Sequence, residues 1–176
     1  MTSEIPTLAS LDYMPYLEGG EIANEWQHKI GVYAIFDAEN VLQLVDYSRD
    51  IYLSLRQHLV RCPEQCHWLK GFMISRPSRT ILEDIRQAWI TENGTLPPGN
   101  GSDSERWHDP IDAKVTMTAA EQEKFTKQEE RDQIKLLKNV ARRLEADILQ
   151  QLAQRGVTME IRFNPKLKEQ GLLDLK

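Results

Sequence analysis

Residues 30–36 have the sequence Ile-Gly-Val-Tyr-Ala-Ile-Phe, and residues 41–46 have the sequence Val-Leu-Gln-Leu-Val-Asp. Both runs are rich in β-branched, aromatic and other apolar side chains, which is typical of buried strands. The short segment 37–40 (Asp-Ala-Glu-Asn) between them favours a hairpin loop. We therefore predict that Tyr33 and Leu44 lie on adjacent antiparallel strands.

Helical patterns follow this hairpin. Ser48 is suited to cap a helix that extends to about residue 60 and covers one face of the sheet. A third strand is expected over residues 68–75, and Ser78 is suited to cap a helix over residues 79–92. The apolar face of that second helix is expected to comprise Ile81, Leu82, Ile85, Ala88 and Trp89. The predicted fold class is α/β, with a small sheet flanked by helices.

The composition excludes several classes of protein. The chain has 176 residues, is 40% hydrophobic and carries 22 Lys and Arg against 27 Asp and Glu, so we expect a folded chain with a net charge of -5. This acidic balance disfavours non-specific nucleic-acid binding. Two cysteines do not make a disulfide scaffold. With no membrane span and no signal peptide expected at residues 1–6, the predicted location is cytoplasmic.

Four parts are expected along the chain. Residues 1–29 are predicted to form an N-terminal arm and residues 30–100 the main domain. Residues 101–117 follow a stretch rich in Gly, Pro, Asn and Ser, and we expect them to be a linker in which Trp107 anchors a loop. Residues 118–176 are predicted to contain a long helix, a short strand and a tail.

The long C-terminal helix is the most distinctive pattern. Thr118 and Glu121 form a capping box, and Gly156 is a natural stop, so we expect one helix over residues 119–155. A short edge strand is expected over residues 157–163. The helix has one apolar stripe, which either packs on its own domain or binds a partner protein or a second copy of the chain. The candidate partner-binding residues on this stripe are Leu137, Val140, Leu144, Ile148 and Leu152.

The order of these elements resembles the GIY-YIG nuclease family, in particular its degenerate members of cyanobacteria and plastids. The resemblance covers roughly residues 29–100. It depends on Gly31-Val32-Tyr33 in the first strand, on the spacing to the second strand and its helix, and on Leu82-Glu83 in the later helix, followed by Pro98 and Asn100. It implies a small GIY-YIG-like sheet flanked by helices, and a family chemistry of metal-assisted phosphodiester hydrolysis.

The family's functional residues are only partly present. By resemblance, Tyr33 matches the tyrosine that helps to activate water, and Glu83 matches the metal ligand. Leu44 stands where the second tyrosine is expected, Asp46 replaces a glycine, and Ser54 replaces the arginine that contacts the phosphate. A carboxylate at position 46 would repel a phosphate group. We therefore expect these positions to be vestigial, with no catalytic residue, no cofactor and no metal. Glu83 remains the candidate for a residual metal site.

Another cluster of potential metal ligands comprises His58, Cys62, Cys66 and His67. Its spacing matches no common zinc pattern, and Pro63 interrupts the helix that would align the first three residues. Two buried cysteines that act as small apolar side chains are the preferred interpretation.

These observations favour a non-catalytic binding or assembly protein, and the expected contacts are mainly with proteins. Its partner would be another protein or a second copy of the chain, bound through the C-terminal helix. If the resemblance reflects its lineage, a role in assembling photosynthetic complexes is expected. The alternative is a metal-dependent GIY-YIG endonuclease or a binder of structured DNA.

Overall fold

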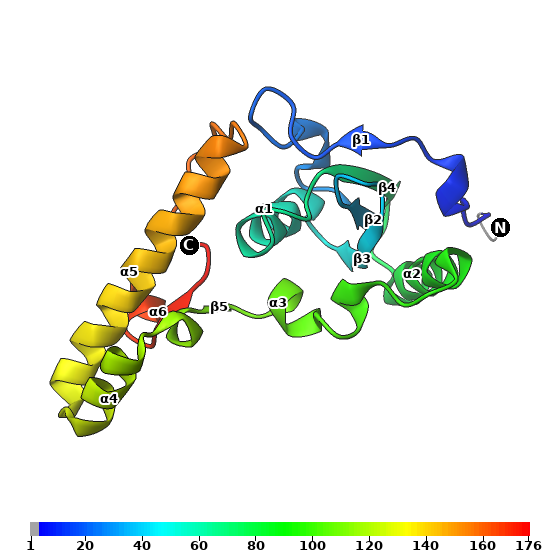
Figure 1. Cartoon of the computed structure of the whole chain (residues 1–176). Coiled ribbons are helices and arrows are strands. Elements are labelled where there is room, and N and C mark those ends of the chain that lie inside the picture. The colour runs from blue at the N-terminus through cyan, green and yellow to red at the C-terminus, as the bar shows by residue number, and fades with distance from the viewer. Residues whose placement is uncertain (1–3) are drawn as a thin grey trace. The chain divides into compact units, whose positions relative to one another are not determined.

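A four-stranded antiparallel sheet organises the first of two compact units in the computed structural model, which describes residues 4–176. The central strand β2 (Ile30–Phe36) pairs with β3 (Leu42–Ser48) on one side and with β4 (Trp68–Ile74) on the other (Figure 1). Tyr33 lies opposite Asp46, so both side chains project from the same face of the sheet. The predicted hairpin and the predicted third strand are both confirmed.

The segment before the sheet is an integral part of this unit. Strand β1 (Met14–Pro15) pairs with β4 and forms one edge of the sheet, and short 3₁₀ helices cover Leu8–Ser10 and Asn24–Trp26. The side chain of Tyr16 is completely buried, and its hydroxyl donates a hydrogen bond to the backbone oxygen of Leu55. The described part of the predicted arm, residues 4–29, therefore packs into the domain. Residues 1–3 lie outside the described part of the chain, as does the first half of the segment in which no signal peptide is expected.

Helix α2 (Arg79–Asn93) covers one face of the sheet and forms an apolar core with it. The side chain of Ser78 accepts a hydrogen bond from the backbone N–H of Ile81, as expected for the predicted cap. Only part of the predicted apolar face is buried, because Ile81 is 43% exposed and Ala88 is half-buried. This core, which we call the α2 face, includes Val32, Ala34, Phe36, Leu42, Val45, Leu82, Ile85 and Trp89.

Helix α1 (Ile51–Arg61) covers the opposite face, which we call the α1 face (Figure 1). Its cap differs from the prediction. Asp50, not Ser48, is the N-cap, and its carboxylate accepts a hydrogen bond from the backbone N–H of Leu53. Ser48 is still the last residue of β3, and its hydroxyl instead accepts from the N–H of Asp50. The serine thus shapes the turn that precedes the helix.

The predicted linker over residues 101–117 is wrong, because this segment is folded. It contains α3 (Ser104–His108), β5 (Ile111–Asp112) and a 3₁₀ helix over Ala113–Thr116. The indole of Trp107 is 1% exposed and fixes the first part of the segment to the first unit. The two compact units comprise residues 1–108 and 109–176.

The second unit contains α4 (Ala119–Lys127), α5 (Glu130–Gln154), α6 (Pro165–Lys168) and β6 (Leu172–Leu173), which pairs with β5. A long C-terminal helix is present, but the single helix predicted over 119–155 is interrupted. Gln128 and Glu129 adopt extended backbone angles.

Side-chain contacts stabilise this interruption. The amide of Gln133 donates a hydrogen bond to the carbonyl of Phe125 in the last turn of α4, and this carbonyl also accepts from the backbone N–H of Gln128. Arg143 of α5 forms an ion pair with Glu121 of α4 at 2.8 Å. Since these two residues are 22 positions apart, α4 folds back along α5.

The apolar stripe of α5 is largely covered by the chain itself. Leu137, Val140, Ile148 and Leu152 are buried, and Leu144 is half-buried. Binding of a partner through these five side chains therefore stays a prediction, and it would require the stripe to be uncovered.

Two smaller features complete the description. Residues 157–163 do not form the predicted strand, and Phe163 makes only an isolated bridge with Leu175. Among residues 4–176, no helix combines the length and the apolar character needed to cross a membrane.

Candidate functional site

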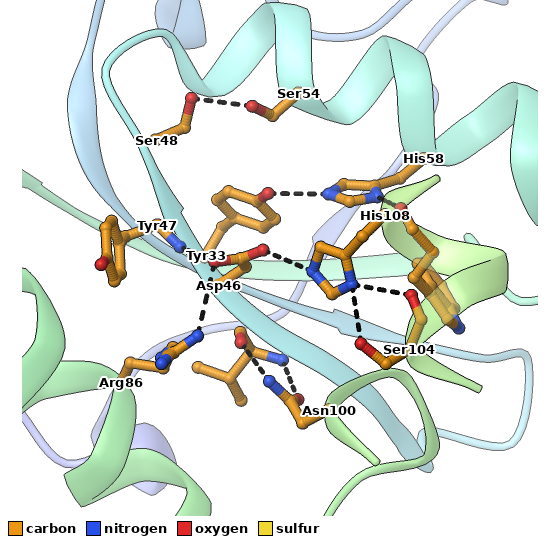
Figure 2. Close-up of polar contacts among 12 residues, drawn as sticks. Tyr33, Asp46, Tyr47, Ser48, Ser54, His58, Arg86, Asn100, Ser104 and His108 are labelled. Atoms are coloured by element: carbon orange, nitrogen blue, oxygen red, sulfur yellow. Dashed lines mark hydrogen bonds and ion pairs between the residues drawn. The ribbon is translucent and has the colours of Figure 1, made fainter. Parts of the chain in front are cut away.

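The residues that the nuclease resemblance singles out gather mainly on the α1 face (Figure 2). Tyr33 and Asp46 lie opposite each other on β2 and β3. Leu44, two residues before Asp46, is completely buried on the same face. Ser54 of α1 donates its hydroxyl hydrogen to Ser48 at 2.7 Å. The structure therefore brings the positions 33, 44, 46 and 54 together, as the resemblance implies, but two of them are occupied by a leucine and a short hydroxyl.

Tyr33 is held by a histidine. Its hydroxyl oxygen lies 2.7 Å from Nε2 of His58, and Nδ1 of His58 lies 3.1 Å from the carbonyl oxygen of Trp107. A carbonyl can only accept, so Nδ1 carries a hydrogen and Nε2 accepts the hydroxyl hydrogen of Tyr33. Burial lowers the pKa of His58 to about 3. His58 is therefore neutral at physiological pH, in the tautomer protonated on Nδ1.

This arrangement leaves Tyr33 unsuited to proton abstraction. Its side chain is 2% exposed, and burial, together with the nearby Asp46 carboxylate, raises the pKa of Tyr33 well above the usual value for a phenol. A phenol that stays protonated and already donates to an imidazole cannot take a proton from water. The residue that matches the family's water-activating tyrosine acts here as a buried hydrogen-bond donor.

Asp46 is paired with a second histidine, His108, which is charged whereas His58 is neutral. Nε2 of His108 lies 2.8 Å from a carboxylate oxygen of Asp46, and Nδ1 lies 2.9 Å from the carbonyl oxygen of Ser104 (Figure 2). Both oxygens are acceptors, so both ring nitrogens carry hydrogens and the ring is an imidazolium. The hydrogen bond with Asp46 raises the pKa of His108, in agreement with this geometry.

Arg86 of α2 lies between the carboxylate of Asp46 and that of Glu83, the candidate metal ligand. Its guanidinium is 2.6 Å from Glu83 and 3.9 Å from Asp46. Hydrogen bonds from Arg86 and Gln87 lower the pKa of Glu83, whose side chain is 36% exposed. The guanidinium of Arg86 therefore compensates the negative charge of both carboxylates. Within residues 4–176, no group of three or more His, Cys, Asp or Glu side chains is placed to hold a metal ion.

The cluster of His58, Cys62, Cys66 and His67 does not converge on one point. His58 points to Tyr33, and both cysteine side chains are buried free thiols. Burial raises the pKa of Cys62 to about 12. These observations match the interpretation of the cysteines as small apolar side chains.

A short loop and helix α3 close the site. Gly99, in the 3₁₀ helix Pro98–Asn100, lies so near the backbone oxygen of Gln43 that a Cβ there would approach it to 2.7 Å. The same Cβ would lie 3.0 Å from side-chain atoms of Leu44 and Trp107. The position of the family's second tyrosine is thus covered by packed side chains.

The carboxamide of Asn100 closes the edge of the sheet. It accepts from the N–H of Val45 at 2.9 Å and donates to the carbonyl of Val45 at 2.7 Å (Figure 2). This pair of hydrogen bonds imitates a neighbouring strand at the exposed edge of β3. An added strand from another protein cannot pair at this point unless Asn100 moves.

The sequence did not reveal His108 and Arg86 as partners on this face, and it indicated His58 only as a member of a potential metal cluster. One signal was present, because a carboxylate at position 46 in a half-buried strand requires a compensating cation. The sequence did not indicate which cation, since His108 is 62 residues away and Arg86 comes from the helix on the other face. Together these groups neutralise and orient one another.

No family model matches this chain. It is similar to a plant protein, the bifunctional monothiol glutaredoxin-S16, chloroplastic, of Arabidopsis thaliana, with 32% identity over 106 residues. The similarity covers 58% of this chain and 35% of the relative, so the chain spans about a third of the length of the protein that it matches.

Proposed function

We propose that this chain is a non-catalytic protein-binding module, built on a degenerate GIY-YIG scaffold whose former nuclease face is closed. One observation carries the proposal: Tyr33 donates its hydroxyl hydrogen to a neutral histidine while the adjacent Asp46 forms an ion pair with His108. Phosphodiester hydrolysis requires an activated nucleophile, stabilisation of charge on the phosphate and, in this chemistry, a metal. Tyr33 is engaged as a hydrogen-bond donor, and the nearby cations His108 and Arg86 are paired with Asp46 and Glu83, which supports the proposal that this face does not hydrolyse phosphodiesters.

The charge distribution favours a protein over a nucleic acid as the partner of the first unit. Residues 1–108 contain nine Lys and Arg against fifteen Asp and Glu. Nucleic-acid affinity depends on contacts between basic side chains and phosphates, and it is opposed by net negative charge. The name of the relative includes the word chloroplastic, which agrees with the expected plastid-type lineage. A role in assembling photosynthetic complexes stays part of the proposal.

A redox function is the second candidate, because the relative is called a monothiol glutaredoxin. Thiol exchange needs an accessible cysteine with a substantial thiolate fraction. Cys62 has a buried side chain and a pKa of about 12, and the thiol of Cys66 is buried and donates to the carbonyl of His58 at 3.6 Å. These two sites count against glutaredoxin chemistry in this chain.

A nuclease assay tests the proposal. The purified chain is incubated with labelled duplex DNA, branched DNA and RNA, in Mg²⁺ and separately in Mn²⁺. We expect no cleavage above background. Cleavage that is lost in both Tyr33→Phe and Glu83→Ala would overturn the proposal in favour of the endonuclease.

The matched gain-of-function variant is Leu44→Tyr/Asp46→Gly/Ser54→Arg, which restores the family's residues at three positions. Weak cleavage by this variant alone would support the GIY-YIG origin of the scaffold. We expect little activity even there, because Tyr33 remains bonded to His58 and Leu44 lies beneath packed side chains.

A further inference from the structure

Four cations lie along one side of α5. Arg131, Lys135, Lys138 and Arg142 follow the spacing i, i+4, i+7 and i+11. At 100° per residue they fall within about 60° of the helix circumference, over a length of about 16 Å. Three of them are exposed and Lys138 is half-buried, so the row lies on the solvent side of α5, beside the apolar stripe.

Helix α6 continues this row. One shallow hollow is lined by Glu130, Arg131, Ile134, Lys135 and Lys138. A second hollow, lined by Lys138, Arg142, Pro165, Lys166, Lys168 and Glu169, shares Lys138 with the first. The two hollows are therefore neighbours, and we call their joint surface the basic groove. It brings six Lys and Arg side chains together with two carboxylates.

Most cations of the basic groove lack a counter-charge. Lys138 pairs with Glu169 at 3.4 Å, and Lys168 pairs with Glu145. The other four make no ion pair with any of the residues 4–176, whereas Lys127 and Arg143 elsewhere in the same unit do pair. Like charges at this spacing repel one another unless an anion approaches. The unpaired cations are Arg131, Lys135, Arg142 and Lys166.

The dimensions and chemistry of the basic groove select the type of anion. No aromatic side chain lines either hollow, so there is no platform for stacked bases. The chain as a whole carries a net charge of -5, which opposes capture of a long polyanion. An acidic helix, in contrast, presents carboxylates at the same i, i+4 and i+7 spacing. Leu149, 38% exposed and two turns beyond Arg142, offers an apolar contact at the end of the row.

We propose that the basic groove docks an acidic helical segment of a partner protein. This inference deepens the proposed function and rests on it, since it names the class of partner and the surface that binds it. Complementary charge would both accelerate encounter and fix the register of the segment. The surface lies beside the apolar stripe, so binding does not require α5 to leave its packing.

The test uses the full chain and a fluorescein-labelled helical peptide with glutamates at i, i+4, i+7 and i+11. Binding is followed by fluorescence anisotropy at low and at physiological salt. The test variant is Arg131→Gln/Lys135→Gln/Arg142→Gln. The control is Lys124→Gln/Lys127→Gln/Arg162→Gln, which removes the same charge from exposed positions outside the groove. We expect about a tenfold loss of affinity in the test variant and less than about twofold in the control.

Several results would overturn this inference while leaving the proposed function intact. One such result is that the glutamate peptide does not bind, or that the test and control variants lose the same affinity for it. Another is that a peptide with glutamines in place of the glutamates binds as tightly, or that an oligonucleotide of equal charge binds more tightly. Concentration-dependent dimerisation that only the test variant abolishes would assign the groove to a second copy instead. Cleavage of nucleic acid by the chain would overturn the proposed function itself.

Discussion

The two faces of the small sheet are closed by different kinds of interaction. On the α2 face, Trp89 and its neighbours bury apolar surface, a contribution that depends on area and hardly on direction. On the α1 face, Tyr33, His58, Asp46 and His108 are held by hydrogen bonds that require particular tautomers and charges. The first face resembles the core of any small domain. The second resembles an active site whose groups satisfy one another instead of a substrate.

This difference supports the proposal that the α1 face is not catalytic. Catalytic groups are poised to react, with exposed nucleophiles and perturbed pKa values. Here the perturbed groups compensate each other, with a neutral histidine beneath Tyr33 and a charged one beside Asp46. The predictions below separate the two faces, beginning with the largest expected effect.

Truncation of a buried side chain on the α2 face should cause the largest loss of stability. Trp89→Ala removes a fully buried indole and should lower the free energy of unfolding by about 3–5 kcal/mol. Ile81→Ala on the same helix is the control, with an expected change within about 0.5 kcal/mol because the side chain is 43% exposed. Urea denaturation measures both. Similar losses in the two variants would show that α2 does not pack as described.

A fall in pH should lower the stability of the folded chain through protonation of His58 on the α1 face. Its pKa is depressed to about 3 in the folded chain, so the unfolded chain binds the proton first and stability falls as the pH drops below about 6.5. Between about pH 7 and pH 4 this histidine alone should cost about 3 kcal/mol. The measurement compares denaturation of the wild type and His58→Gln across this range. A parallel decline in both proteins would contradict the assignment.

The close approach of Gly99 should make its replacement costly. In Gly99→Ala the new methyl group would meet the backbone oxygen of Gln43 at 2.7 Å, and we expect a loss of about 1–3 kcal/mol. Gly101→Ala is the matched control, because the atom nearest to its Cβ, at 2.8 Å, belongs to the flexible side chain of Leu96. Thermal melting of both variants would check this. Equal melting temperatures would mean that the loop does not press on the strand.

The smallest effect is expected for the partly exposed ion pair. The pKa of His108 is raised in the folded chain, so its contribution is full below about pH 6.5 and is lost as the pH rises through the folded value. His108→Gln should cost about 0.5–1 kcal/mol at about pH 6, and less at about pH 9. Guanidinium denaturation at the two pH values, with matched ionic strength, measures this. A cost that grows with pH would contradict a charged His108.

The contrast between the faces also describes what could be predicted from the sequence. The hairpin, the third strand and both flanking helices follow from apolar periodicity, which is a local signal, and the cap of α2 at Ser78 was also predicted. The cap of α1 is Asp50 and not the predicted Ser48. The break at Gln128 was not foreseen, because it depends on Gln133 and Arg143 reaching back to α4. The folded segment around Trp107 was not predicted either, because its polar composition is typical of a linker.

The candidate site shows the same division. The positions of Tyr33, Leu44, Asp46 and Ser54 followed from the resemblance. The groups that neutralise them did not, because hydrogen bonds across 25 to 62 residues leave no periodic pattern. The basic row of α5 does have helical spacing, but the sequence does not show that Lys166 and Lys168 of α6 lie beside it.

The charge states of the two histidines test the closed α1 face most directly. Nitrogen-15 spectra of imidazole groups, assigned with His58→Gln and His108→Gln, report on the hydrogen carried by each ring nitrogen. At about pH 6 we predict a neutral His58 protonated only on Nδ1 and a doubly protonated His108, in line with their opposite pKa shifts. A His58 that titrates between about pH 5 and pH 8, or a His108 that is neutral at about pH 6, would contradict the account.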